Sequence, residues 1–396
     1  EVPAPATGEL VGKVPLASAA DVDAACAAAR KAFDEGPWPQ MSPAERAEIL
    51  GRAVKILEER GDELKFLLAA ETGQPPTIVD MMQYGAAMSS FQYFAGAADK
   101  FTWRDIRDGI YGQTMVVREP IGVVAAVTAW NVPFFLAANK LGPALLAGCT
   151  IVVKPAAETP LSLFAMAEIF AEAGLPEGVL SVVPGGPETG RALTANPEID
   201  KFTFTGSSAV GKEIAKIAAE KLKPCSLELG GKSAAIILED ADLDSTLPML
   251  VFSGLMNCGQ ACVGQTRILA PRSRYDEVVE KLSAAVAAMP IGLPDNAGAM
   301  IGPLISEKQR ERVEGYIKKG VDEGARIVTG GGRPEGLDGG WFVQPTVFAD
   351  VDNSMTIAQE EIFGPVLAVL AYEDDDDAVR IANNSIYGLS GGVFGD

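Results

Sequence analysis

Histidine is absent from this chain of 396 residues. Its absence excludes a Ser-His-Asp triad and a Cys-His pair formed within the chain, so any nucleophilic catalysis must take its base from Glu, Asp, Lys or water. Long apolar runs are missing as well. The run at residues 121–130 has the length of a buried strand, and the N-terminal stretch EVPAPATGELVGKV lacks the apolar core of an export signal. We therefore expect no membrane association.

Cysteine is sparse and positive charge is in deficit. The odd number of five cysteines in a long chain predicts reduced thiols and a cytoplasmic location, not a disulfide framework. Only Cys258 and Cys262 are close in sequence, too few ligands for structural zinc, so no metal is expected. The formal net charge of −20 argues against nucleic acid as a partner, because such proteins need a basic face. This net charge still allows a local basic pocket for one small anionic ligand.

From about Gly122 onward, short β-rich runs alternate with longer helical runs. Strands are predicted at GVVAAVTAW, TIVVKP, LSVVPGG, FTFT and SAAIIL, with helices starting near 134, 161 and 210 between them. This alternation is typical of a parallel sheet covered by helices, so we predict an α/β fold. Two helices precede it, one at 21–33 and one opened by Ser42 as N-cap with Glu45 as its capping-box partner.

Other segments complete the predicted organisation. The run DGIYGQTMVVREP (108–120) predicts a two-stranded hairpin that belongs to neither sheet. After Gly230 a second α/β segment follows, with helices near 242–256, 274–288 and 306–323, and a last one at DDDDAVRIANN whose acidic residues form a solvated first turn. The chain stops within a predicted strand, Gly391–Phe394, so we expect the last domain to lack its C-terminal end.

Three loops that follow strands are candidates for holding phosphate groups. GSSAVGKE (206–213) is close to a Walker loop, but Glu213 replaces the hydroxyl residue that binds magnesium, so that interpretation is rejected. The serines of this loop are equally consistent with two interpretations: a site for one bound phosphate, and an ordinary helix N-cap. Alone, PGGPETG (184–190) is typical of a glycine-proline turn, and Lys154 of KPAAETP of a solvated charge. Together, at successive strand ends, they indicate a dinucleotide laid across the sheet edge.

Glu228 and two cysteines are the candidate catalytic groups. Glu228 lies between Leu227 and Leu229 at the end of a β-like run, where partial desolvation would bring its carboxylate toward the working range of a general base. The alternative is an edge-strand glutamate with its carboxylate in water. Cys262 is a candidate nucleophile because accessible thiolates are the reactive form. The alternative makes Cys258 and Cys262 buried apolar residues on one helical face.

Six short motifs follow one another along the chain: AWNVP (129–133), KPAAETP (154–160), FTGSSAVG (204–211), LELGGK (227–232), GQAC (259–262) and EEIFGP (360–365). In this order and spacing, the sequence resembles the aldehyde dehydrogenase superfamily over essentially its whole length. The resemblance implies NAD(P)-dependent oxidation of an aldehyde to the carboxylic acid. It also implies a Rossmann-like cofactor domain at 1–229, interrupted by an oligomerisation hairpin at about 103–120, and a second α/β catalytic domain at 230–396.

The same resemblance implies roles for individual residues. Cys262 corresponds to the nucleophile, Glu228 to the general base, Asn131 to the amide that holds the oxyanion, and Lys140 to a lysine that assists proton transfer. A thiohemiacetal on Cys262 would lose hydride to the nicotinamide, and water activated by Glu228 would hydrolyse the thioester. Cofactor contacts are implied for Thr128, Trp130, Lys154, Glu158, Gly186, Thr205, Gly206, Ser207, Val210, Leu229, Glu361 and Phe363.

Three departures from the family pattern bear on these expectations. Family members commonly carry Glu three residues after the strand-end lysine, where it favours NAD over NADP. Here Ala157 occupies that position and the acid is displaced to Glu158, which weakens the preference for NAD over NADP. NAD is the expected cofactor, and NADP stays open. Ala129 replaces the usual Pro before Trp130. Typical members also continue well beyond residue 396, with the end of the catalytic domain, a wall of the substrate tunnel and a strand used in subunit association.

The substrate and the assembly are less closely specified. Phe134 and Phe135, which follow Asn131, suggest an apolar tunnel and hence a hydrophobic aliphatic or aromatic aldehyde. The family's domain-exchanged hairpin implies a homodimer or homotetramer. Two alternatives stay open: a non-catalytic binding or structural protein of the same fold, and ester hydrolysis by the thiol as a side activity. The complete set of Cys262, Glu228 and Asn131 argues against the first.

Overall fold

The computed structural model describes residues 1–396, which form two compact units. The first unit comprises Glu1–Val2, Gly12–Leu68 and Val79–Glu228. The second comprises Pro3–Val11, Ala69–Ile78 and Leu229–Asp396. The last changeover, after Glu228, falls inside the LELGGK motif. No helix in the chain is both long and apolar enough to cross a membrane.

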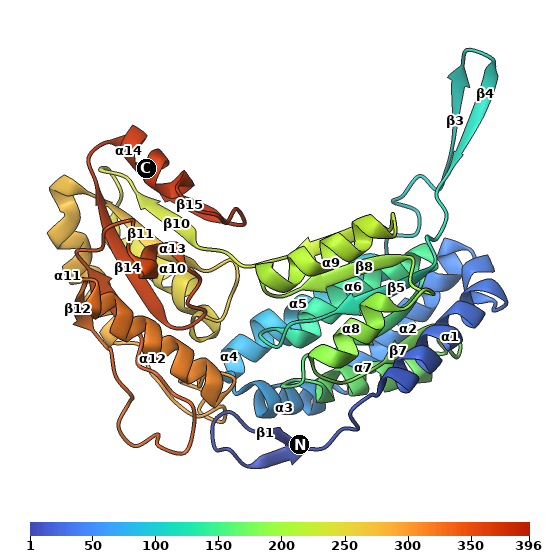
Figure 1. Ribbon diagram of the computed structural model, residues 1–396, viewed down its shortest axis with the longest axis horizontal. Coiled ribbons are helices and arrows are strands. Elements are labelled where there is room, and N and C mark those ends of the chain that lie inside the picture. The colour runs from blue at the N-terminus through green and yellow to red at the C-terminus, as the bar shows by residue number, and fades with distance from the viewer. The chain divides into compact units, whose positions relative to one another are not determined.

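A five-stranded sheet organises the first unit (Figure 1). Its strands are β5 (Val123–Val127), β6 (Thr150–Lys154), β7 (Leu180–Val182), β8 (Lys201–Thr205) and β9 (Cys225–Glu228). All neighbours pair in parallel, in the order β7-β6-β5-β8-β9. The chain thus builds outward from β5 on one side and then returns to its other side, so a topological switch point lies between β5 and β8. This sheet confirms the predicted Rossmann-like parallel arrangement.

Helices connect these strands and follow the predicted runs closely. They are α6 (Pro133–Ala147), α7 (Leu161–Glu172), α8 (Pro187–Ala195) and α9 (Ser208–Glu220). Helix α6 illustrates why helix ends can be predicted from the sequence. Pro133 occupies its first turn, and Gly148 ends the helix with a left-handed φ of 95°. Strands β5 and β6 are buried along almost their whole length, as expected for a parallel sheet that helices cover.

The N-terminal helices are α1 (Ala19–Asp34), α2 (Pro43–Glu59), α3 (Gly61–Thr72) and α5 (Ala86–Ala95). The predicted capping box of Ser42 and Glu45 is present at α2. Helix α1 starts earlier than predicted, because Ser18 and Asp21 form a second capping box. The short helix α4 (Pro76–Ile78) and a π-helical segment, η2 (Val79–Gly85), precede α5, and sequence patterns did not predict either one.

The hairpin of β3 (Arg104–Gly109) and β4 (Gly112–Val117) pairs only with itself, as predicted (Figure 1). It carries exposed apolar side chains on both strands and at its turn: Ile106, Ile110, Tyr111, Met115, Val116 and Val117. A second small sheet pairs β1 (Val2–Pro3) with β2 (Leu10–Gly12).

The second unit is built on a six-stranded sheet in the order β12-β13-β14-β11-β10-β15. Only the pair of β12 and β13 is antiparallel. The strands are β10 (Ser233–Ile237), β11 (Gln265–Pro271), β12 (Arg326–Thr329), β13 (Thr346–Ala349), β14 (Val366–Tyr372) and β15 (Gly391–Phe394). The predicted strand at 391–394 is therefore present, and it lies at the edge of this sheet.

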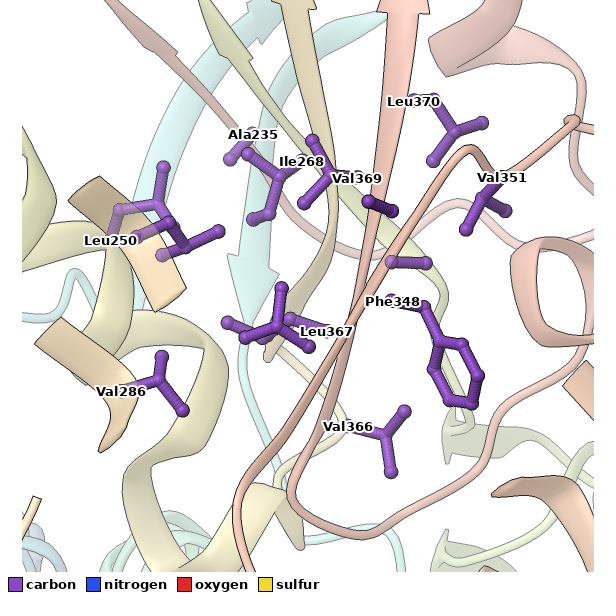
Figure 2. Packing of buried hydrophobic residues seen from close by; sticks show 14 of the residues in the cluster. Ala235, Leu250, Ile268, Val286, Phe348, Val351, Val366, Leu367, Val369 and Leu370 are labelled. Carbon is purple, nitrogen blue, oxygen red and sulfur yellow. The ribbon is translucent and has the colours of Figure 1, made fainter. Parts of the chain in front are cut away.

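The helices of the second unit are α10 (Leu243–Leu255), α11 (Tyr275–Ala287), α12 (Glu307–Asp322), α13 (Thr356–Gln359) and α14 (Asp375–Asn383). Asp374 caps α14, and the following aspartates form its exposed first turn, as predicted. Figure 2 shows the core of this unit, where Leu250 of α10 and Val286 of α11 lie with strand residues such as Ile268 and Phe348. Each such fully buried side chain stabilises the unit by about 1.5–3 kcal/mol.

Candidate active site

The predicted cofactor residues of the first unit gather at the carboxyl edge of its sheet. Val127, the last residue of β5, pairs with Lys154, the last residue of β6. On the other side, Thr205 at the end of β8 pairs with Glu228 at the end of β9. Motifs that are far apart in the sequence are therefore brought to one edge by strand register. In open α/β sheets this edge is where ligands bind.

Two buried hydroxyl groups at this edge have no hydrogen-bond partner. They are Oγ1 of Thr128, directly after β5, and Oγ1 of Thr205, the last residue of β8. Both side chains are almost completely buried. Because a buried polar group without a partner is costly, two of them flanking the switch point fit a site that a polar ligand completes. The donor set suits the ribose and phosphate oxygens of a dinucleotide.

The GSSAVG loop lies at the N-terminus of α9. Ser207 is the N-cap, and its hydroxyl accepts a hydrogen bond of 3.4 Å from the backbone N–H of Val210. Of the two interpretations that the sequence left open, the serine N-cap is thus present. Ser207 and Val210 are both exposed, so the positive end of the α9 dipole stays accessible to an anion. Gly186 is likewise the N-cap of α8, as the glycine-proline turn predicted.

Lys154 is buried, which contradicts its interpretation as a solvated charge. Its ammonium group donates a 2.9 Å hydrogen bond to the carbonyl of Pro155. Burial lowers the pKa of Lys154, and the negative charge of Glu158 partly opposes that shift. Glu158 itself is half-buried and Ala157 is exposed. The displaced acid therefore still acts electrostatically on the lysine at the end of β6.

Asn131 is buried just before α6, and a residue that sequence patterns missed contacts it. Gln83, fully buried in η2, donates from Nε2 to the Asn131 carbonyl at 3.5 Å. Its Oε1 accepts from the backbone N–H of Phe134 at 3.3 Å. Gln83 thereby bridges the two ends of the turn that leads into α6. Trp130, one residue earlier, is half-buried. No sequence pattern distinguished Gln83 from the other polar residues of the segment 79–91.

Lys140 faces the sheet from α6. It is buried, and its ammonium group donates to Thr203 Oγ1 of β8 at 3.3 Å. Burial lowers the pKa of Lys140 to about 8, while the negative charge of Glu228 opposes that shift. A lysine with such a pKa exchanges protons near neutral pH, as a group in general acid–base chemistry must. Lys140 and Glu228 are thus electrostatically coupled within the first unit.

The predicted desolvation of Glu228 is wrong. Glu228 is the last residue of β9, which forms the edge of the five-stranded sheet, and its side chain is exposed. The alternating pattern of β9 points Leu227 inward and Glu228 outward. The alternative interpretation, an edge-strand glutamate with its carboxylate in water, describes this position. Its accessibility leaves Glu228 free to reach solvent water.

In the second unit, the NCGQAC loop turns sharply after α10. Asn257 and Cys258 both adopt left-handed backbone angles, with φ of 53° and 56°, and Gly259 follows with φ of 68°. Left-handed conformations at non-glycine residues each cost about 1–3 kcal/mol, so the surroundings must hold them. At Gly259 a side chain could not fit, because a Cβ atom would lie 2.0 Å from the carbonyl oxygen of Gly364. The two cysteines therefore do not share a helical face, contrary to that alternative.

A buried polar network holds this turn. Gln74 Nε2 donates to Asn257 Oδ1 at 2.7 Å. Asn257 Nδ2 donates to the Gln260 carbonyl at 3.1 Å, and Gln260 Nε2 donates back to the Asn257 carbonyl at 3.2 Å. Gln260 Oε1 also accepts from the backbone N–H of Ile305 at 3.0 Å. Three buried amide side chains thus fix the backbone from which Cys262 follows.

The turn places the two thiols in different environments. Cys258 is 2% exposed, and burial raises its pKa to about 12. Cys262 is half-buried and lies beyond the turn, before β11. Since the thiolate is the reactive form, Cys258 is inert near neutral pH. Of the pair, only Cys262 is accessible enough to react.

The EEIFGP motif contacts the LELGGK motif within the second unit. Glu361 is half-buried and accepts a 3.0 Å hydrogen bond from the backbone N–H of Gly231, and burial raises its pKa. Phe363 is held in a left-handed conformation with φ of 60°. Its carbonyl accepts a 2.8 Å hydrogen bond from Gln309 of α12. Leu229, at the start of this unit, is half-buried.

Gly231 lies directly against Cys262. A Cβ atom at Gly231 would come within 2.4 Å of the Cys262 carbonyl oxygen. A small cavity of about 10 Å³, lined by Gly231, Ala261, Glu361 and other residues of the three motifs, lies beside them. The GQAC, LELGGK and EEIFGP motifs therefore converge in space. No cluster of His, Cys, Asp or Glu suited to a metal ion is present in the chain.

Comparison with known proteins identifies the family to which this chain belongs. The family model described as the aldehyde dehydrogenase family matches residues 1–396. The chain belongs to the aldehyde dehydrogenase family.

Solved structures and characterised relatives agree with this assignment. The crystal structure of Mycobacterium tuberculosis aldehyde dehydrogenase complexed with NAD+ is 69% identical, with a TM-score of 0.98 over 100% of this chain and 82% of that chain. Geranial dehydrogenase of Castellaniella defragrans is 46% identical over 98% of this chain and 81% of its own length. Benzaldehyde dehydrogenase of Antirrhinum majus is 42% identical over 98% of this chain and 73% of its own length.

The two cysteines of this aldehyde dehydrogenase can be distinguished by alkylation. At pH 7.5 we expect iodoacetamide to modify Cys262 and to leave Cys258 unmodified, because a thiol with a pKa near 12 is ionised in only roughly one molecule in 3 × 10⁴. Peptide mass spectrometry of the folded protein locates the label. In Cys262→Ser, Cys258 should remain unmodified, which excludes mere competition between the two. Labelling of Cys258 at a rate equal to that of Cys262 would contradict the assignment.

Proposed function

We propose that this protein oxidises an aldehyde to the carboxylic acid and transfers the hydride to NAD(P)+. The observation that carries the proposal is the NCGQAC turn, which buries one thiol and leaves Cys262 accessible. Family membership supports the reaction class. We further propose that the first unit is the cofactor-binding domain and the second the catalytic domain that carries the nucleophile.

Cys262 is proposed to attack the aldehyde carbon as a thiolate. The new C–S bond makes the carbon tetrahedral and places negative charge on its oxygen, which the side-chain amide of Asn131 is proposed to stabilise by donating a hydrogen bond. The chemistry that bound NAD(P)+ would supply is that of a hydride acceptor; once the hydride has left, the carbon would remain attached to Cys262 as a thioester. No histidine and no metal ion is needed at any step.

Glu228 is proposed as the base for hydrolysis. Its exposed carboxylate removes a proton from water, whose oxygen attacks the thioester carbon, and the C–S bond breaks to release the acid and the Cys262 thiolate. Lys140, electrostatically coupled to Glu228, is proposed to accept the proton from that carboxylate. The buried Gln83, bonded to the Asn131 carbonyl, is proposed to hold the oxyanion turn in place.

The cofactor is proposed to bind at the carboxyl edge of the first unit's sheet. Thr128 and Thr205 would supply their unpaired hydroxyls, and the exposed N-terminus of α9 at Ser207 would bind the pyrophosphate. The other first-unit contacts proposed are Trp130, Lys154, Glu158, Gly186, Gly206 and Val210, with Leu229, Glu361 and Phe363 of the second unit. NAD is the proposed cofactor, since a solved relative at 69% identity is an NAD+ complex. Ala157, in place of the usual acid, keeps NADP as a second candidate.

The substrate is proposed to be an apolar aldehyde. Geranial and benzaldehyde dehydrogenases are among the relatives, and Phe134 and Phe135 follow Asn131 in the sequence. The exposed apolar hairpin β3–β4 is proposed to be a subunit contact in a homodimer or homotetramer. None of the five cysteines forms a disulfide, which supports a reducing compartment, for which we propose the cytoplasm.

Absorbance of the reduced nicotinamide tests the reaction. We expect NADH formation with benzaldehyde or geranial, and no signal from Cys262→Ala. Glu228→Gln should lose a factor of roughly 10² to 10⁴ in steady-state rate, because it lacks the general base, yet keep a rapid first turnover of NADH. Cys258→Ala is the matched control and should retain activity. A folded wild-type protein that reduces neither NAD+ nor NADP+ would favour a non-catalytic protein.

The pH profile tests Lys140 separately. Because burial lowers its pKa to about 8, its neutral form accumulates as the pH rises through that value. We expect kcat to rise through about pH 8 in the wild type and to lose this limb in Lys140→Met, with a kcat lower by a factor of roughly 10². An unchanged limb in the variant would assign that ionisation to another group.

A further inference from the structure

Gln74 connects a distant part of the chain to the nucleophile turn, residues 257–262. It lies in the segment Ala69–Ile78, which belongs to the second unit, although 183 positions separate it from Asn257. The side chain is 4% exposed, and its Nε2 donates to Asn257 Oδ1 at 2.7 Å. Because a buried amide that loses its partner pays the full cost of desolvation, this bond is expensive to remove. The reaction proposed above gives Gln74 no role.

The backbone of Gln74 is itself held in place. Pro75 follows it and disfavours helical angles at Gln74. Its N–H donates to Thr72 Oγ1 at 3.4 Å. Gly73 has a φ of 72°, and a Cβ atom there would lie 2.6 Å from the ring of Pro303. The loop is therefore packed so closely that the Gln74 amide has a fixed point of departure.

Asn257 transmits this constraint along the nucleophile turn. Its Nδ2 donates to the Gln260 carbonyl at 3.1 Å. The carbonyl of Ala261, one residue further, accepts from the N–H of Gly264 at 3.0 Å. Both peptide carbonyls that precede Cys262 thus have a hydrogen-bond partner, which fixes the direction of each peptide plane. The direction in which the Cys262 side chain leaves the backbone follows from these planes.

The turn would relax without such bonds. Asn257 and Cys258 are both left-handed, and each such residue costs about 1–3 kcal/mol unless its surroundings hold it. The bond from Gln74 also polarises the Asn257 amide, which strengthens the bond that Nδ2 donates to Gln260. Attack on a carbonyl carbon is sensitive to such changes, because a misplacement of about 1 Å can slow a reaction by roughly 10².

We propose that Gln74 is a positioning residue for the nucleophile: by holding Asn257, it keeps the Cys262 thiol in the orientation from which it attacks the aldehyde. This inference rests on the proposed function, since it concerns the attack step. Gln74 acts through the turn and contacts neither substrate nor cofactor in this account. Loss of its amide should therefore slow the first turnover, leave the KM for NAD+ unchanged and expose Cys258.

Stopped-flow measurement of the first turnover tests the catalytic part. With NAD+ and benzaldehyde in excess, we expect Gln74→Met to form its first NADH about 10 to 10² times more slowly than the wild type, with a KM for NAD+ within about twofold. Gln359→Met is the matched control. It removes an amide of the same unit that bonds to Asn353 and Asn384, outside the turn, and should keep the wild-type rate.

A double-mutant cycle tests the route through Asn257. Asn257→Gly removes the side-chain amide, and glycine adopts left-handed angles without strain. If Gln74 acts through Asn257, adding Gln74→Met to Asn257→Gly should slow the first turnover no further. A second slowing of full size in that background would overturn the proposed route.

Alkylation tests the hold on the turn without any catalysis. At pH 7.5 we expect iodoacetamide to label Cys258 at least about tenfold faster in Gln74→Met than in the wild type, because the loosened turn opens more often. Gln359→Met should protect Cys258 as the wild type does. A wild type that forms no NADH would contradict the proposed function, and the alkylation rates would then decide by themselves whether Gln74 holds the turn.

Two results would overturn the inference. The first is a folded Gln74→Met protein with the wild-type rate of first turnover and a protected Cys258. The second is a lower melting temperature with an unchanged first turnover, which would assign Gln74 a purely structural role. If circular dichroism shows that Gln74→Met is unfolded, Gln74→Asn decides, since it keeps the amide and loses only the reach of one methylene group.

Discussion

The turn after α10 is the constraint on which the proposed chemistry depends. Asn257, Cys258 and Gly259 run left-handed in succession, and this reverses the chain so that Cys258 is buried and Cys262 remains accessible. Such a backbone is unfavourable by about 1–3 kcal/mol for each of the two non-glycine residues. It persists because buried amides of Gln74 and Gln260 bond to Asn257, and because glycine at 259 fits against the Gly364 carbonyl.

Strand register plays the corresponding part in the first unit. Parallel pairing aligns the last residues of β5, β6, β8 and β9, so groups from distant motifs reach one edge of the sheet. Burial then sets their chemistry: Lys140 and Lys154 both have lowered pKa values because they are desolvated. The same edge leaves Thr128 and Thr205 with unpaired hydroxyls, which a bound dinucleotide would satisfy.

Much of the fold could be predicted from local sequence signals. Ser42 with Glu45, and Pro133 with Gly148, mark helix ends through backbone rules that act within one turn, and the apolar runs mark buried parallel strands. Features set by distant contacts were not predictable. Gln83 reaches Asn131 across 48 positions, and Gln74 reaches Asn257 across 183. The exposure of Glu228 follows from the edge position of β9, which its flanking leucines do not reveal.

The central claim is that Cys262 carries the reaction as a covalent acyl group. Its most direct test is the mass of Glu228→Gln, quenched by acid within the first turnover with NAD+ and benzaldehyde. The account predicts a benzoyl group on the peptide that contains Cys262, formed in proportion to the NADH produced, because the thioester accumulates when hydrolysis is slow. NADH formation without an acyl group on Cys262, or with the acyl group on another residue, would contradict it.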